Sequence, residues 1–244
     1  MKIFDLHAHL ARNPITKEYE FDELINDMYI NGIEKRVVST LQGKSVKIQN
    51  DTIIEFVRKY PDKLIGCGVI NPKEDDALEE VKRIASFKEI KIIEFNSLEH
   101  GYRPEKMQYI LDPIFDYCTK NLLLIKVFTG HGFWTMPDQW AFYARRYQEL
   151  TFIILHMGGS DFSYGTLELC KEIPNIVLEM SYETEMQPLK KALKEVDPEK
   201  LFYGSNYYHN FTDLSIMKFR AIDIEEAKKE LLFYKNAKKL LKLE

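Results

Sequence analysis

The sequence is poor in cysteine, and its three cysteines lie far apart. Cys67, Cys118 and Cys170 form no C-x-x-C pair and are odd in number. This pattern predicts neither a disulfide framework nor a thiolate zinc site. We expect all three thiols to be reduced, buried and inert.

Long apolar runs and an excess of basic residues are also missing. No stretch is long enough to span a bilayer, and the chain opens directly with a predicted strand, without a charged and then apolar leader. The formal net charge is -4 and the lysines are scattered among glutamates, so no basic surface for nucleic acid is expected. We therefore expect a cytoplasmic protein with neither a membrane nor a nucleic-acid partner.

No Pro- or Ser-rich linker, low-complexity tract or shift in composition marks a second domain. The chain has 244 residues, of which 45% are hydrophobic and 30% charged, which allows a sizeable core. Apolar runs predict strands at residues 1–9, 35–41, 63–70, 90–95, 122–128, 152–156, 175–180 and 201–206. Helical spacing predicts helices at 20–31, 51–60, 75–86, 105–120, 137–150, 184–196 and from about 212 onward.

This alternation determines the predicted fold class. Strands that are continuous apolar runs, separated by amphipathic helices, are typical of a parallel sheet covered by helices. Eight such repeats favour a closed barrel over an open sheet. We predict an α/β protein in which residues 1–244 form a single (β/α)8 TIM barrel.

The first predicted strand ends in a His-x-His pair. Because side chains alternate along a strand, His7 and His9 share one face and can bind one metal ion together. For an isolated pair, two structural histidines are the simpler interpretation. The adjacent Asp5, the position at the start of the strand–helix pattern and a third histidine at a later strand end, His156, favour a metal site.

Further polar residues fall at the carboxyl ends of the other strands, where a (β/α)8 barrel has its active site. Strand four brings Glu94, or Lys91 if its register is shifted. The later strand ends and the loops just after them bring His131, His156, Glu179, Asn206 and His209.

Five short motifs occur in order along the chain. They read D-L-H-A-H at 5–9, D-P-I-F at 112–115, L-H-M-G-G at 155–159, F-Y-G-S-N at 202–206 and N-A-K-K-L-L at 236–241. Together they resemble the amidohydrolase-related metal-dependent hydrolases, the branch of the amidohydrolase superfamily that includes aminocarboxymuconate decarboxylase-like enzymes. The resemblance extends over essentially the full length.

The resemblance implies one divalent metal ion, commonly zinc. The His-x-His pair, a strand-five His and a strand-eight Asp would hold it, with the strand-six His, here His156, near the substrate. The ion would activate water to attack a small-molecule amide, ester or lactone, or would support decarboxylation. A homodimer is also expected from the resemblance.

Two positions depart from this pattern. The strand-five segment reads Phe128-Thr129-Gly130 where the family has His-Thr-Gly, and strand eight reads Gly204-Ser205-Asn206 where the family has Gly-Ser-Asp. Phenylalanine cannot bind a metal, and an amide cannot take a proton from water near pH 7. The site is therefore either rebuilt or disabled.

A rebuilt site has several candidate residues. His131 could turn back to the ion, although it could equally be a loop histidine; Glu94 matches the strand-four glutamate of the similar TatD-type nucleases, unless it faces the helices; and Asn206 could offer its carbonyl oxygen. Lys126 lies two positions before Phe128, so the two side chains point to the same face of the predicted strand. It could place a positive charge inside the barrel and pair with Glu179, or extend to solvent from the strand's start.

Two functional hypotheses follow. The leading one is a metal-dependent hydrolase of small molecules with His7, His9, His156 and His131 as metal ligands and His156, Asn206 and Glu94 as catalytic residues. The alternative is a degenerate barrel that binds a small ligand without hydrolysis. A phosphoesterase of the polymerase-and-histidinol-phosphatase type also begins with D-x-H-x-H, but the further Asp-His pairs that it would need are missing.

Overall fold

The computed structural model describes residues 1–41 and 45–243, which form an eight-stranded parallel sheet with its strands in sequence order. The strands are β1 (Ile3–Leu10), β2 (Ile33–Thr40), β3 (Leu64–Ile70), β4 (Ile90–Phe95), β5 (Leu124–Val127), β6 (Phe152–Ile154), β7 (Ile176–Glu179) and β8 (Leu201–Phe202). The segment after β8 returns to β1. The backbone N–H of Leu6 donates to the carbonyl of Tyr203 and that of Asn206 to the carbonyl of His7, at 3.0 and 2.9 Å. These contacts nearly close the sheet, and the predicted (β/α)8 TIM barrel is confirmed.

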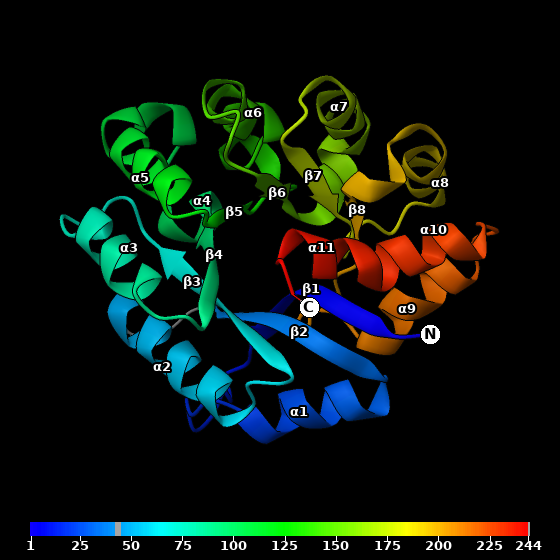
Figure 1. The fold of residues 1–244 in the computed structure, drawn as a ribbon, viewed down its shortest axis with the longest axis horizontal. Coiled ribbons are helices and arrows are strands. Elements are labelled where there is room, and N and C mark those ends of the chain that lie inside the picture. The colour runs from blue at the N-terminus through cyan, green and yellow to red at the C-terminus, as the bar shows by residue number, and fades with distance from the viewer. Residues whose placement is uncertain (42–44, 244) are drawn as a thin grey trace.

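Helices lie between consecutive strands and surround the sheet (Figure 1). They are α1 (Phe21–Ile30), α2 (Val46–Lys59), α3 (Ala77–Ala85), α5 (Gln108–Lys120), α6 (Pro137–Arg146), α7 (Gly159–Glu172) and α8 (Met186–Glu195), with the short α4 (Ser97–His100) after β4. The chain continues after β8 with α9 (Thr212–Arg220), α10 (Glu226–Glu230), the π-helical segment η5 (Leu231–Lys235) and α11 (Asn236–Leu240). Figure 1 shows α11 crossing one end of the barrel beside β1. None of the described helices is long and apolar enough to cross a membrane.

The interior of the barrel is filled by apolar side chains toward the amino ends of the strands. This cluster comprises Phe4, Leu6, Val37, Ile65, Cys67, Ile92, Ile153, Val177 and Phe202, with Ala237 and Leu241 from the C-terminal segment packed against it. A second, larger cluster lies between the sheet and the helices. Because apolar residues fill the amino-terminal half of the interior, polar groups can meet only in the carboxyl-terminal half. The three cysteines are free and buried, as expected.

The structure corrects two parts of the predicted pattern. Helix α7 was not predicted, because Gly158-Gly159-Ser160 at its start is more typical of a loop. Strand six was predicted to reach His156, but β6 ends at Ile154 and the chain then makes a tight turn in which His156 has φ 62°. This left-handed backbone is rare for a residue with a side chain, and in native proteins such positions concentrate at functional sites.

Candidate active site at the carboxyl ends of the strands

A layer of polar side chains lies directly above the apolar interior. Four polar residues each lie two positions after an interior apolar residue of the same strand. They are Ser39 on β2, Glu94 on β4, Lys126 on β5 and Glu179 on β7. Since side chains on a strand alternate between its two faces, both members of each pair point inward. His7, His9 and His156 complete the layer, and all seven side chains are buried.

The two histidines of β1 enter this layer through an irregularity in the strand. Phe4 and Leu6 pack inside the barrel, and the register between β1 and β2 then shifts between Asp5 and Ala8. Such a shift turns the following residues to the other face, so that His7 and His9 also point inward. Strict alternation along the strand would place Asp5 on the same face as the two histidines. Because of the register shift, Asp5 instead points to the opposite face of β1.

Asp5 lies on the helix side of β1 and ties three segments together. Its carboxylate accepts hydrogen bonds from Arg36 Nε of β2 at 2.7 Å, from the backbone N–H of His7 at 3.1 Å, and from the N–H and hydroxyl of Ser205 at 2.9 and 2.6 Å. Arg36 also pairs with Asp27 of α1 at 2.7 Å. This buried network fixes the strand ends that carry His7 and Asn206.

A chain of side-chain contacts crosses the polar layer. Nζ of Lys126 lies 3.0 Å from Oε2 of Glu94 and 3.3 Å from Nδ1 of His7. Nε2 of His7 lies 3.3 Å from Nε2 of His156, whose Nδ1 is 3.0 Å from the carbonyl oxygen of Thr129. Segments distant in sequence thus converge on one centre.

Glu94 and His9 form one side of this centre. The Ser39 hydroxyl donates to Oε2 of Glu94 at 2.7 Å and lies 3.0 Å from Nδ1 of His9. Oε1 of Glu94 is buried and has no hydrogen-bond partner among the described residues. It is therefore an open acceptor inside the barrel.

Three residues of the layer could hold a metal ion. One donor atom each of His7, His156 and Glu179 lie within 4.8 Å of one another. Two nitrogens bound to a tetrahedral zinc ion at about 2.0–2.1 Å are roughly 3.3 Å apart, which is the separation of the two Nε2 atoms. The donor set therefore fits a single divalent ion, provided that both nitrogens present lone pairs.

Burial determines the charges of these groups. It lowers the pKa of His7 and of His9 well below the ordinary value, and the charge of Lys126 acts in the same direction. It also lowers the pKa of His156 to about 4 and raises the pKa of Glu179 to about 7. The imidazoles are therefore neutral near pH 7, the form in which histidine binds metals.

The structure places the remaining predicted site residues as follows. Glu94 faces the interior and Lys91 is exposed, which decides the register of strand four. Two predicted ligands, His9 and His131, do not belong to the group of three possible metal ligands. Nδ1 of His9 lies against the Ser39 hydroxyl instead, and His131 is exposed and stacks on Phe128, with ring centroids 5.7 Å apart. Asn206 is buried beside His7.

Lys126 lies inside the barrel, which was one of the two positions expected for it. The sequence suggested Glu179 as its ion-pair partner, but the structure pairs it with Glu94. Glu179 instead accepts hydrogen bonds from the backbone N–H groups of His156 and Ser181 and from the hydroxyl of Ser181. It thereby holds the turn that carries His156.

Two aromatic rings cover His156. The ring of Phe128 meets it edge-on at 5.0 Å between centroids, and that of Tyr182 lies 5.5 Å away. Both are half-buried, so they lie between the polar layer and solvent. Tyr182 was not identified from the sequence, because nothing in the loop after strand seven distinguishes it.

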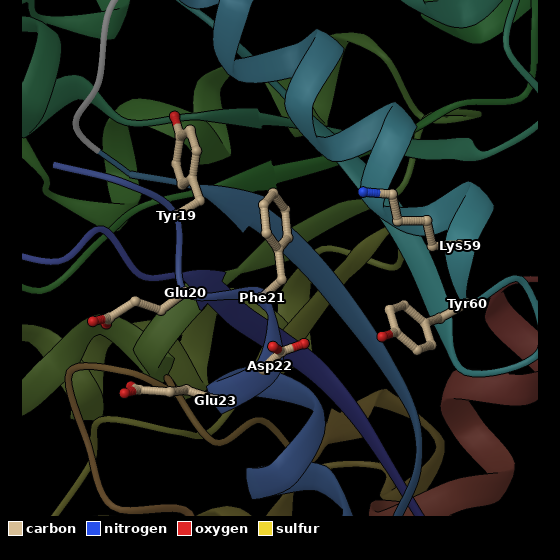
Figure 2. Close-up of a pocket in the computed structure, with 7 residues that line it drawn as sticks. All are labelled: Tyr19, Glu20, Phe21, Asp22, Glu23, Lys59 and Tyr60. Atoms are coloured by element: carbon tan, nitrogen blue, oxygen red, sulfur yellow. The ribbon is translucent and has the colours of Figure 1, made fainter. Parts of the chain in front are cut away.

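A separate cavity of about 320 Å³ lies outside the barrel, between the start of α1 and the end of α2 (Figure 2). Its lining includes Glu20, Phe21, Asp22, Lys59 and Tyr60, and Figure 2 shows the end of the Lys59 side chain near the ring of Phe21, with Nζ 5.4 Å from the ring centroid. None of its lining residues belongs to the polar layer. The histidine centre therefore remains the candidate active site.

Comparisons with known proteins agree with the fold. The family model described as amidohydrolase matches residues 5–243. No curated protein matches the sequence. Solved structures with the same fold include an uncharacterized TIM-barrel protein from Bordetella bronchiseptica, with a TM-score of 0.81, 16% identity and 99% of each chain covered.

Decarboxylases are among these structures. A 2,6-dihydroxybenzoate decarboxylase from Rhizobium has a TM-score of 0.76 and 16% identity, with 99% of this chain and 98% of that chain covered. A 5-carboxyvanillate decarboxylase from Novosphingobium aromaticivorans, with bound manganese, has a TM-score of 0.73 and 19% identity, with 91% of this chain and 80% of that chain covered. The match to the family model extends over nearly the whole sequence, and the chain therefore belongs to the amidohydrolase family.

Proposed function

We propose that this chain is a metal-dependent enzyme that removes the carboxylate from a small, planar carboxylic acid. His7, His156 and Glu179 would hold one divalent ion, manganese or zinc, which when bound supplies a Lewis-acidic charge for the oxygens of the substrate. The observation that carries the proposal is the convergence of neutral imidazoles and a carboxylate at the carboxyl ends of the strands. That the similar structures include decarboxylases supports the choice of reaction.

The side chains around the ion site suit such a substrate. Lys126 offers a buried ammonium and Glu94 Oε1 an open acceptor beside it, so a carboxylate and a hydroxyl group could be oriented at neighbouring positions. Phe128 and Tyr182 offer ring faces against which a planar molecule can pack.

The residue at strand eight favours decarboxylation over hydrolysis. Asn206 cannot act as the base that deprotonates water, whereas in decarboxylation carbon dioxide leaves and a proton takes its place on the carbon, so that no attacking water is needed. Hydrolysis of an amide, ester or lactone is the second candidate, because Glu179, with its pKa raised to about 7, could serve as the base if it were free of the ion.

Activity assays on manganese-loaded protein test the proposal. Carbon dioxide release is measured with a panel of hydroxybenzoic acids, and product formation with a panel of lactones and esters. The expected result is turnover of at least one aromatic acid that falls by roughly 100-fold or more in His156→Asn and is unchanged in Lys91→Met, whose side chain is exposed on β4.

Glu179→Gln distinguishes the two reactions. If the wild type hydrolyses a lactone or ester, and Glu179→Gln loses this activity while still binding manganese, hydrolysis is the function and the proposal of decarboxylation is wrong. Metal-loaded, folded protein that turns over neither panel would instead favour a barrel that only binds a ligand.

A further inference from the structure

Lys126 places a positive charge against a proposed metal ligand. Its side chain is fully buried, and its Nζ lies 3.0 Å from Oε2 of Glu94 and 3.3 Å from Nδ1 of His7. The Glu94 carboxylate is itself held by the Ser39 hydroxyl at 2.7 Å, so the ion pair is fixed from two sides.

The partners of the two histidines determine where their protons lie. An ammonium group has only donors, so Nδ1 of His7 accepts from Lys126 and the single proton of the neutral His7 ring is on Nε2. The carbonyl of Thr129 can only accept, so the proton of His156 is on Nδ1 and its Nε2 carries a lone pair. His7 Nε2–H then donates to His156 Nε2 across 3.3 Å. Each nitrogen has one role, and the hydrogen-bonded chain is complete.

A metal ion requires the opposite arrangement at His7. To bind an ion between the two rings, His7 must present the lone pair of Nε2 and carry its proton on Nδ1. A metal-bound histidine normally donates its other N–H to a carboxylate, a carbonyl or water. Here that N–H would point at the ammonium of Lys126, a donor facing a donor.

We propose that Lys126 limits the metal affinity of this site, because its ammonium group holds His7 in the tautomer that cannot bind an ion. The inference rests on the proposed function, in which His7 and His156 hold the ion. The Lys126–His7 hydrogen bond and the bound ion exclude one another. The lysine therefore sets how tightly the ion is held, and it is a positioning residue for His7.

Manganese affinity tests the inference without reference to turnover. The full chain is titrated with Mn²⁺, with binding followed by calorimetry and by the electron paramagnetic resonance signal of the free ion. The proteins compared are the wild type, Lys126→Met, the double variant Lys126→Met/Glu94→Gln, and Lys91→Met as the control on β4. The double variant removes both charges of the ion pair, so that no buried carboxylate is left unpaired and no added negative charge attracts the ion.

We expect both Lys126 variants to bind Mn²⁺ roughly tenfold or more tightly than the wild type, the effect of changing a partner of a ligating histidine, and Lys91→Met to bind like the wild type. A double variant that binds Mn²⁺ no more tightly than a metal-binding wild type would overturn the inference and leave the proposed function intact. Folded wild-type and variant proteins that all fail to bind Mn²⁺ would overturn both.

A second measurement on the wild type does not depend on how the variants fold. The ¹⁵N chemical shifts of the imidazole nitrogens in metal-free protein report which nitrogen of His7 is protonated. The inference requires a proton on Nε2 and none on Nδ1. A proton on Nδ1 of His7 would refute it.

Discussion

Nε2 of His7 and Nε2 of His156 lie 3.3 Å apart, although the two histidines are 149 positions apart in sequence. The contact joins β1 to the turn after β6 across the interior of the barrel. It exists because β1 shifts register just before His7 and because the backbone of His156 adopts a positive φ. Two local departures from regular strand geometry thus create the centre of the site.

Restoring the family's strand-five ligand should strengthen metal binding. The ring of Phe128 already meets that of His156 edge-on at 5.0 Å, so the variant Phe128→His would bring a third imidazole close to the two Nε2 atoms. We expect the affinity for Zn²⁺ or Mn²⁺ to rise by roughly tenfold or more, measured by competition with a chelator. Phe128→Leu is the matched control and should leave the affinity near that of the wild type. Equal affinities for the His and Leu variants would place Phe128 outside the reach of the ion.

Arg36 should be essential for stability. Arg36→Met leaves the Asp5 carboxylate buried without its cation, and breaking a buried ion pair in this way typically costs about 3–5 kcal/mol of the free energy of unfolding. Arg145→Met is the control, since the Arg145–Glu172 pair is largely exposed and should contribute less than about 1 kcal/mol. Urea unfolding measures both. Similar losses in the two variants would show that the Asp5 network does not stabilise the contact between β1 and the segment after β8.

His156 should make the fold sensitive to acid. Its pKa is about 4 in the folded protein, below the ordinary value of 6.5, so between these pH values the unfolded chain binds a proton that the folded chain does not. Stability is therefore lost as the pH falls from about 6.5 toward about 4, by up to about 3 kcal/mol at roughly 1.4 kcal/mol per pKa unit.

The variant His156→Asn should lose less stability over this range. Glu179 acts in the opposite direction, because its raised pKa lowers stability as the pH rises from 4.5 to about 7. That contribution is expected in both proteins and cancels in the comparison. The free energy of unfolding measured at several pH values gives the two slopes. Equal slopes would mean that His156 is not a buried neutral imidazole.

Lys218 should hold the loop that carries Tyr182. Its ammonium donates to the backbone carbonyls of Met180, Ser181 and Glu183 at 2.7, 2.5 and 3.0 Å. Lys218→Met removes all three hydrogen bonds, and we expect faster hydrogen exchange at residues 181–185, with roughly 1–3 kcal/mol less stability. Exchange in β1 provides the internal reference. Unchanged exchange in the loop would assign its order to other contacts.

Much of the fold was predictable, because eight apolar runs alternate with amphipathic helices. The inward position of Lys126 was one of two alternatives left open, and its burial decided between them. The inward position of Glu94 was one of two registers left open, and burial decided between them. Helix α7 was missed, because its glycines and serines are typical of loops.

The site itself was less predictable. Period-two alternation groups Asp5 with His7 and His9, but the register shift in β1 separates them, and such a shift has no clear sequence signal. The positive φ of His156 follows from tertiary contacts, among them the hydrogen bond from its N–H to Glu179. Ser39 and Tyr182 carry no motif, and only the closed barrel brings them to the histidines.

Anomalous diffraction from crystals grown with Mn²⁺ tests the central claim most directly. The account predicts a single manganese peak within bonding distance of His7 Nε2, His156 Nε2 and a carboxylate oxygen of Glu179. Such a peak should be strong in crystals of Lys126→Met and weaker or partly occupied in the wild type. Water alone between the two imidazoles in both proteins, at saturating Mn²⁺, would contradict the account.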